Sequence, residues 1–324
     1  MTRITRRVAL CGMAALPTAL AAGEAVAQEE FPSKQITILV GFAAGGGGDI
    51  SARWIADYIR EKWKVTAVVE NKPGAGATIA LAQLARSKPD GYTVALATTS
   101  PFAVAPYFQP VQYQTDKDFT FLFQYLVSAQ PLFVRSESQF KTAQELVDWA
   151  KANPGKLNWS TASTNGGPHI ATEAAFRALG ISGQYVPYKG GADAIMGLLS
   201  GHIDALVAAE FPPYASSGKI RLLAESGMEP IAGYPDVPTY KQLGWPVGVP
   251  IFYGLAAPAG VPAPVVAKWE VLGKEMISAP GYADLMSKLV SSASYQDSKT
   301  FTATVVNSYR EMGELIPKLG LKQN

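Results

Sequence analysis

The hydrophobic residues of this chain follow two spacings that alternate along it. Residues 36–40 form a short apolar run with β-branched members, which is typical of a buried strand. A loop of alanines and glycines follows at 41–48, and residues 51–62 then place aromatic and isoleucine side chains at helical spacing. The pattern therefore predicts a strand, a glycine-rich turn and a helix.

The same alternation continues through the first half of the chain. We expect a strand, a second glycine turn, a helix and a third strand at 65–69, 71–76, 78–86 and 93–97. Strands separated by helices favour a parallel sheet that helices cover on both faces. Two aromatic and apolar runs, 119–127 and 131–135, then predict strands that cross to another unit.

A second series of strands and helices follows a capping box formed by Thr142 and Glu145. Its expected strands are 157–160, 185–188, 203–208 and 220–224, with helices at 169–179 and up to residue 199. Helices near 264–278, 282–288 and 300–316 complete the chain. We expect the last part to return to the first unit, which gives lobes of residues 28–125 and 126–223 and a return segment of residues 224–324.

Residues 1–27 have the features of a secretory signal peptide. Three arginines precede an apolar stretch, and Ala25-Val26-Ala27 offers small residues for cleavage after Ala27. The pattern indicates export to the periplasm, by the general or the twin-arginine route. Cys11, the only cysteine, leaves with this segment, so the mature chain is expected to have no thiol chemistry.

Composition excludes several classes of function. The formal net charge of +2 includes the signal arginines, and no basic stripe suggests nucleic acid. No later apolar run reaches membrane-spanning length. His169 and His202 lack other ligands at metal-binding spacing, and no Gly-x-Ser-x-Gly elbow is present. We therefore expect no metal, no cofactor and no catalytic residues.

Two loops at expected strand ends are candidates for anion binding. Glycines at 45–48 leave the first N–H groups of a helix uncovered, and the helix dipole favours a negative charge there. The hydroxyl-rich turn 160–168 offers similar donors on the second unit, with His169 in the following helical turn. Close packing of the first loop, or ordinary capping by Thr164 or Asn165, would explain the same residues without a ligand. The first loop has no Lys-Ser/Thr ending, which disfavours a nucleotide.

Several motifs together resemble the Bug family, the extracytoplasmic solute receptors of tripartite tricarboxylate transporters. The matching segments are Val40 to Asp49, Glu70-Asn71-Lys72-Pro73-Gly74-Ala75-Gly76, Pro89 to Thr93, Val186-Pro187-Tyr188-Lys189-Gly190, Tyr234 to Thr239 and Gly254 to Gly260. The resemblance covers nearly all of the mature chain.

The resemblance implies an α/β fold of two lobes, a type II-like Venus flytrap with a ligand cleft between them. It implies a periplasmic receptor, not an enzyme, that captures a small carboxylate and delivers it to membrane permease subunits. We expect a monomer that closes about a hinge near 126–131 and 222–226. The expected ligand-binding residues are Phe42, Ala43, Ala44, Gly45, Gly46, Asp49, Thr98, Thr99, Ser100, Phe102, Thr161, Ser163, Thr164, Asn165, Gly166, His169, Lys189, Gly190, Glu210 and Phe211.

One departure from the family pattern concerns the ligand. Family members often carry an Asp-Asn pair after the strand at 203–207, and amino-acid binders can use that Asp to contact the ligand's ammonium group. This chain has Ala208-Ala209-Glu210 there, where Glu210 could replace the acid, but the simpler interpretation is that no amine is recognised. We therefore expect an amine-free carboxylate, either aromatic or a small dicarboxylate. Phe102, Tyr107, Phe211 and Tyr253 would line the cleft or pack in the core. A sensor for a membrane kinase and a periplasmic hydrolase are the alternative functions.

Overall fold

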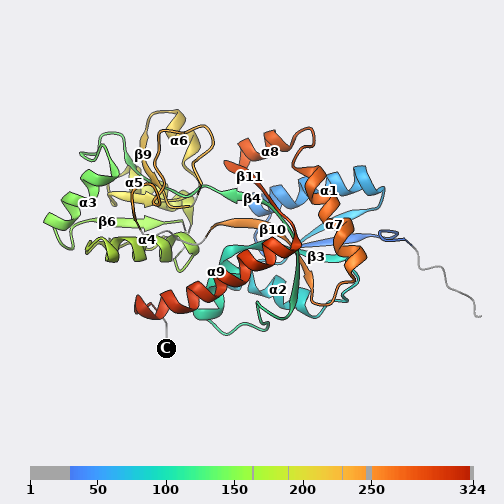
Figure 1. Ribbon diagram of the computed structural model, residues 1–324. Helices are drawn as coiled ribbons and strands as arrows, with labels where there is room; N and C mark the ends of the chain where they lie inside the picture. The colour runs from blue at the N-terminus through green and yellow to red at the C-terminus, as the bar shows by residue number, and fades with distance from the viewer. Residues whose placement is uncertain (1–29, 163, 189, 228, 246–249, 322–324) are drawn as a thin grey trace, which may run out of the picture. The chain divides into compact units, whose positions relative to one another are not determined.

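The computed structural model describes residues 30–321 except 163, 189, 228 and 246–249. The expected signal peptide therefore lies outside the described residues. Residues Phe31–Asn324 form one unit, and the strands described in it make two sheets (Figure 1). No described helix is both long enough and apolar enough to cross a lipid bilayer.

The first sheet has the order β11-β4-β10-β3-β1-β2. Its strands are β1 (Ile36–Val40), β2 (Ala67–Asn71), β3 (Thr93–Thr98), β4 (Phe119–Ser128), β10 (Phe252–Pro258) and β11 (Ser291–Gln296). The strands β1, β2 and β3 are parallel, whereas β10 runs antiparallel to both β3 and β4. The lobe built on this sheet is called the first lobe below.

Helices cover both faces of the first sheet because its strands are apolar on both sides. Ile36 and Ile38 face a core with α1 (Gly47–Trp63), α7 (Ala263–Met276) and α8 (Tyr282–Leu289). Leu39, one residue out of phase, faces the opposite core with α2 (Thr78–Ala85) and α9 (Ser298–Lys318). This alternation follows from the two-residue period of a strand.

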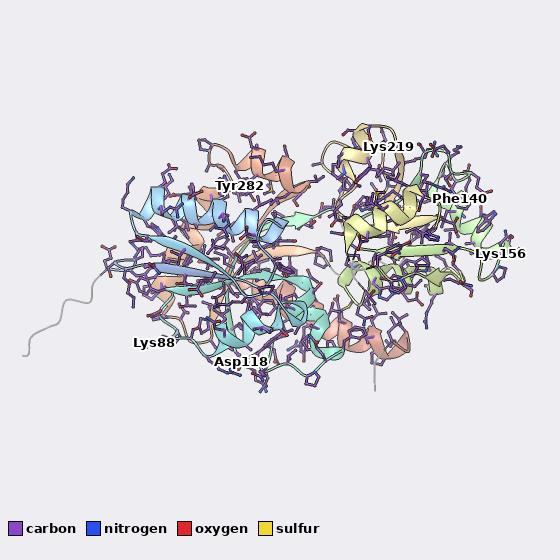
Figure 2. The ribbon with its side chains drawn as sticks, turned by 180° about the vertical axis from the view of Figure 1, so that it is seen from behind. Lys88, Asp118, Phe140, Lys156, Lys219 and Tyr282 are labelled. Atoms are coloured by element: carbon purple, nitrogen blue, oxygen red, sulfur yellow. The ribbon has the colours of Figure 1, made fainter. Side chains whose placement is uncertain are left out.

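The second sheet has the order β7-β6-β8-β5-β9, and the lobe built on it is called the second lobe. Its strands are β5 (Pro131–Arg135), β6 (Asn158–Thr161), β7 (Gln184–Tyr185), β8 (Ala205–Val207) and β9 (Ile220–Glu225). One face packs on α3 (Ala143–Ala152) and α4 (Gly167–Ala178), and the other on α5 (Gly191–Leu199) and α6 (Pro212–Ser216). Figure 2 labels Phe140 in this lobe and Tyr282 in the first, each buried in its own core.

The structure confirms most predicted elements and corrects the sheet type. Both sheets are mixed rather than parallel, since β10 and β5 run antiparallel to their neighbours. The strands β10 and β11 were not predicted. β10 contains Gly254 and three alanines or prolines in seven residues, and β11 is largely serine, so neither shows a β-branched run. Both segments become strands because they pair with β4.

Two connections join the lobes, and they meet at one hydrogen-bonded point. The residues between β4 and β5 include Gln130, whose backbone N–H donates to both Glu225 carboxylate oxygens at 2.9 and 3.1 Å. Glu225 ends β9 and also accepts from the Gly227 N–H at 2.8 Å. The Ser226 hydroxyl donates to the Gln130 carbonyl oxygen at 2.7 Å. We call these residues the hinge crossing; all of them except Gly227 lie within the segments where the sequence predicts a hinge.

The Glu225 carboxylate at the hinge crossing is buried, and its pKa is higher than usual. Glu225 is 1% exposed, and burial raises its pKa from 4.5 to about 7, although the two backbone donors oppose that shift. Burial raises the pKa of the Tyr240 phenol, and the charge of Glu225 raises it further. No described cation forms an ion pair with Glu225.

A second contact between the lobes lies along the C-terminal helix. Ile170 of α4 packs in one buried cluster with Val104, Met312 and Ile316. The last two residues belong to α9, which also covers the first sheet. The helix α9 thus bridges the lobes with apolar side chains. Figure 1 shows its course below α4.

Candidate functional site

The first predicted loop exposes backbone at the start of α1. Residues 43–47 are exposed, whereas Gly48 and Asp49 are buried. The N-cap residue is Gly46, so no side chain caps the helix. Gly45 has a φ of 85°, which a residue without a side chain adopts easily. The first N–H groups of α1 have no acceptor within the helix and lie at its positive end.

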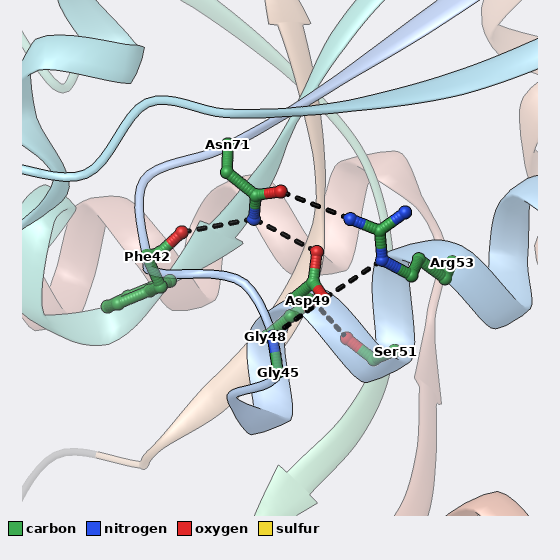
Figure 3. A network of polar contacts seen from close by, with 7 residues as sticks. All are labelled: Phe42, Gly45, Gly48, Asp49, Ser51, Arg53 and Asn71. Carbon is green, nitrogen blue, oxygen red and sulfur yellow. Dashed lines mark hydrogen bonds and ion pairs between the residues drawn. The ribbon is translucent and has the colours of Figure 1, made fainter.

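A polar network anchors this loop from behind (Figure 3). The Asp49 carboxylate accepts from the Gly45 N–H, from Arg53 Nε and from Asn71 Nδ2, each at 2.9 Å. Asn71 also donates to the Phe42 carbonyl oxygen at 3.1 Å, which joins the second glycine turn to the first loop. The hydrogen bond from Arg53 is the main reason why the Asp49 pKa falls to about 2.

This network corrects the role expected for Asp49. Both of its carboxylate oxygens already accept hydrogen bonds from the protein, and its side chain is 4% exposed. It therefore positions the loop instead of contacting a ligand. One loop donor, the Gly45 N–H, is used internally as well.

The end of β3 supplies a second predicted segment, Thr98 to Ser100. The Thr99 hydroxyl donates to the Pro250 carbonyl oxygen at 2.7 Å and accepts from the Phe252 N–H at 3.0 Å. Thr99 is 1% exposed, so it braces β10 and is not available as a ligand donor. The Thr98 hydroxyl is buried without a described partner, and Ser100 is partly exposed.

The second predicted loop is built around His169. The N-cap of α4 is Gly166, again without a side-chain cap. Asn165 has a φ of 57°, and its N–H donates to His169 Nδ1 at 3.0 Å. His169 is buried against Tyr185, and the centroids of the two rings are 3.9 Å apart. Burial lowers the His169 pKa from 6.5 to about 4. The imidazole is therefore neutral at neutral pH and accepts the loop's own N–H.

Tyr185 is a residue that sequence reasoning missed. Its hydroxyl lies within hydrogen-bond distance of the Thr161 and Thr164 hydroxyls, at 3.2 and 3.1 Å. It thus holds the hydroxyl-rich turn from the neighbouring strand β7. The only signal in the sequence was an aromatic residue in a short strand. Ser163 and Lys189, both predicted for the site, lie outside the described residues.

Two predicted aromatic contacts are wrong. Phe102 is 0% exposed and packs edge-to-face against Phe119 and Phe121, because the π-helical turn η2 (Ser100–Val104) directs it into the core. Phe211 is also 0% exposed and packs on Tyr234. Both side chains belong to the core, the alternative left open for them.

A cavity of about 640 Å³ lies between the lobes. Its first-lobe wall includes Gly47 and Ile50 of α1, Tyr253 of β10 and the end of α8. Its second-lobe wall includes Ile195 of α5 and Glu210. The cavity therefore begins where the first loop enters α1. Of the expected ligand-binding residues that the structure describes, only Glu210 lines it, together with Tyr253, one of the aromatic residues expected at the cleft or in the core. The described parts of the two loops thus lie at or beyond its edge. The described residues include no cluster suited to a metal ion.

The comparisons with known proteins decide the family. A family model described as "Tripartite tricarboxylate transporter family receptor" matches residues 51–321. The chain belongs to this family. A curated relative, the "UPF0065 protein in gbd 5'region" of Cupriavidus necator, is 32% identical over 97% of both chains.

Solved structures agree with this assignment. A ligand-free TctC solute binding protein from Polaromonas is 27% identical, with a TM-score of 0.79 over 89% of this chain and 99% of that one. The periplasmic binding protein BugD is 28% identical, with a TM-score of 0.73 over 91% of this chain and 100% of that one. The receptor is thus a two-lobed periplasmic solute-binding protein, not an enzyme.

Proposed function

We propose that this receptor captures a carboxylate without an α-amino group and delivers it to the permease subunits of a tripartite transporter. The supporting observation is the start of α1, where a glycine N-cap leaves backbone donors exposed at the entrance of a cavity between the lobes. Backbone N–H groups at a helix N-terminus bind carboxylates well. The N-cap of α4 is also a glycine without a side-chain cap, but Gly166 and Gly167 are buried and Pro168 has no N–H.

The acid of the first loop supports the exclusion of α-amino acids. An α-ammonium group lies one carbon from the carboxylate, so it would sit beside the first loop. Asp49, the acid of that loop, already has both oxygens engaged by the protein. Burying an ammonium group without an acceptor costs roughly several kcal/mol of solvation free energy. The apolar wall formed by Ile50, Ile195 and Tyr253 favours an aromatic or short aliphatic body.

Replacing Gly46 by valine tests the loop. Gly46 has an extended backbone, and a Cβ there would meet only the Ala43 carbonyl oxygen, at 3.5 Å. The variant should fold normally, while the branched side chain should block approach to the backbone donors and weaken carboxylate binding at least tenfold. Titration calorimetry measures this after a ligand is found by thermal-shift screening of carboxylates.

Gly48→Ala provides the contrasting control within the same loop. A Cβ at Gly48 would lie 2.9 Å from Leu96 and 3.1 Å from Phe42, so this change should lower stability instead. Normal binding by folded Gly46→Val would contradict the proposed site. Succinate should bind more tightly than aspartate, and phthalate more tightly than phenylalanine. The reverse order in either pair would contradict the exclusion of amino acids.

A further inference from the structure

Charge is sparse on the cavity walls. Among the described residues only Glu210, just before α6, and Lys288, in the last turn of α8, carry charged side chains there. Much of the remaining lining is apolar, including Ile50, Leu126 and Ile195. A molecule in the cavity thus meets hydrocarbon, with one acid on the second-lobe wall and one base on the first-lobe wall.

The position of Glu210 is constrained by its neighbours. The next residue, Phe211, is anchored in the core at 0% exposure. The Glu210 carboxylate lies against Gly191, where a Cβ would come within 2.3 Å of the carboxyl carbon. No hydrogen bond or ion pair involves Glu210 among the residues that the structure describes. The carboxylate therefore presents oxygen atoms beside the cavity that no described residue binds.

The charge of Glu210 acts across the cavity. Tyr253, on the first-lobe wall, has a raised pKa, chiefly because it is buried and secondly because the Glu210 charge opposes formation of a phenolate. An anion placed between these two residues would meet the same repulsion at shorter range. Apolar walls screen that repulsion less than bulk water does.

We propose that Glu210 selects against a second carboxylate, so that the ligand is a monocarboxylate with an apolar body. This rests on the proposed function, in which the first carboxylate binds at the start of α1. A ligand held there directs its other end into the cavity, toward the second-lobe wall. An apolar end gains from burial, whereas a second carboxylate loses solvation and faces a like charge.

Lys288 is the residue that would act in the opposite sense. Its side chain is exposed, and it lies at the C-terminal end of α8, where a cation offsets the negative end of the helix dipole. Attraction to a solvated ammonium on a flexible stem is weak. Glu210 is exposed as well, but its carboxylate lies against Gly191 at the cavity wall, so we expect its repulsion to exceed the attraction from Lys288.

Calorimetry with chain-matched acids tests this selection. Pentanoate is compared with glutarate, and benzoate with terephthalate, on the full receptor and on Glu210→Gln, Glu210→Lys and Lys288→Gln. The unchanged receptor should bind each monocarboxylate at least tenfold more tightly than its partner. Glu210→Gln should reduce that ratio about tenfold, and Glu210→Lys should reverse it.

Asp193→Asn is the matched control, because Asp193 lies in the first turn of α5, two residues from the Gly191 that Glu210 lies against, but does not line the cavity. It should leave the ratio unchanged. An unchanged ratio in Glu210→Gln, or a dicarboxylate preference that Lys288→Gln abolishes, would overturn the inference while the receptor still binds carboxylates. If no carboxylate binds the unchanged receptor, the proposed function itself fails.

Discussion

Replacing Glu225 by glutamine should change how the stability of the receptor depends on pH. The folded-state pKa of Glu225 is about 7, against 4.5 when exposed. Between these values the folded protein binds more protons than the unfolded chain, so the free energy of unfolding falls as pH rises. A difference of 2.5 units corresponds to about 3 kcal/mol, from about 1.36 kcal/mol per unit.

His169 contributes a slope of the opposite sign over an overlapping range. Its pKa falls from 6.5 to about 4 on folding, so the unfolded chain binds more protons between these values. The His169 contribution to stability is complete above pH 6.5 and is lost as the pH falls toward 4. From pH 4.5 to 6.5 the two contributions largely cancel in the unchanged protein.

Each variant should therefore reveal the slope of the remaining group. Glu225→Gln should become more stable with rising pH between 4.5 and 6.5, by about 1 kcal/mol per unit relative to the unchanged protein. His169→Asn, which keeps an acceptor for the Asn165 N–H, should show the reverse slope. Urea denaturation followed by circular dichroism at four pH values gives the free energies. Subtracting the unfolding free energy of the unchanged protein at each pH removes the contribution of the other titrating groups.

The reasoning fails if Glu225→Gln has the same pH dependence as the unchanged protein between pH 4.5 and 7. That result would mean that water or movement at the hinge crossing solvates the carboxylate. Parallel curves displaced by a constant would report a lost hydrogen bond without any proton linkage.

Three further outcomes are expected. Thr142→Ala removes the hydroxyl that accepts the Glu145 N–H at 3.1 Å and should cost about 1 kcal/mol in urea denaturation; no loss would show that the cap is replaced by water. Gly254→Ala places a Cβ 2.3 Å from Phe301 and 2.5 Å from a backbone carbonyl oxygen, so it should lose about 3 kcal/mol or more, and an unchanged midpoint would contradict this packing. A saturating ligand should reduce the radius of gyration in small-angle scattering, since the lobes close about the hinge crossing; an unchanged radius would argue against closure.

The strands with apolar, β-branched runs could be predicted well from the sequence. β1 and β5 have the predicted bounds, because each is buried on both faces and each sequence shows it directly. β10 could not be found this way. Its glycine and alanines allow close contact with β4 and Phe301, and that contact is visible only in three dimensions.

The candidate site was predicted in outline and corrected in detail. The glycine loops could be predicted from the sequence. Glycines directly before a helix are a local feature, and they leave the first N–H groups of the helix uncovered without help from any distant residue. The ion pair of Asp49 with Arg53 was not predicted, although Arg53 lies four residues later on the same helix, a spacing at which such pairs form. The hinge role of Glu225 was missed; its only signal was an acid that ends an apolar strand. The core positions of Phe102 and Phe211 depend on local turns that composition does not reveal.

The place of β10 has a consequence for the order of folding during synthesis. All strands of the second sheet lie within residues 131–225, so that sheet is complete before β10 leaves the ribosome. β3 and β4 cannot pair with each other, because β10 stands between them. A nascent chain that ends before residue 252 therefore carries an open edge on β3 and open edges on both sides of β4. The first lobe begins to be synthesised before the second, yet it is the last to finish folding. Truncated products should therefore aggregate through those edges.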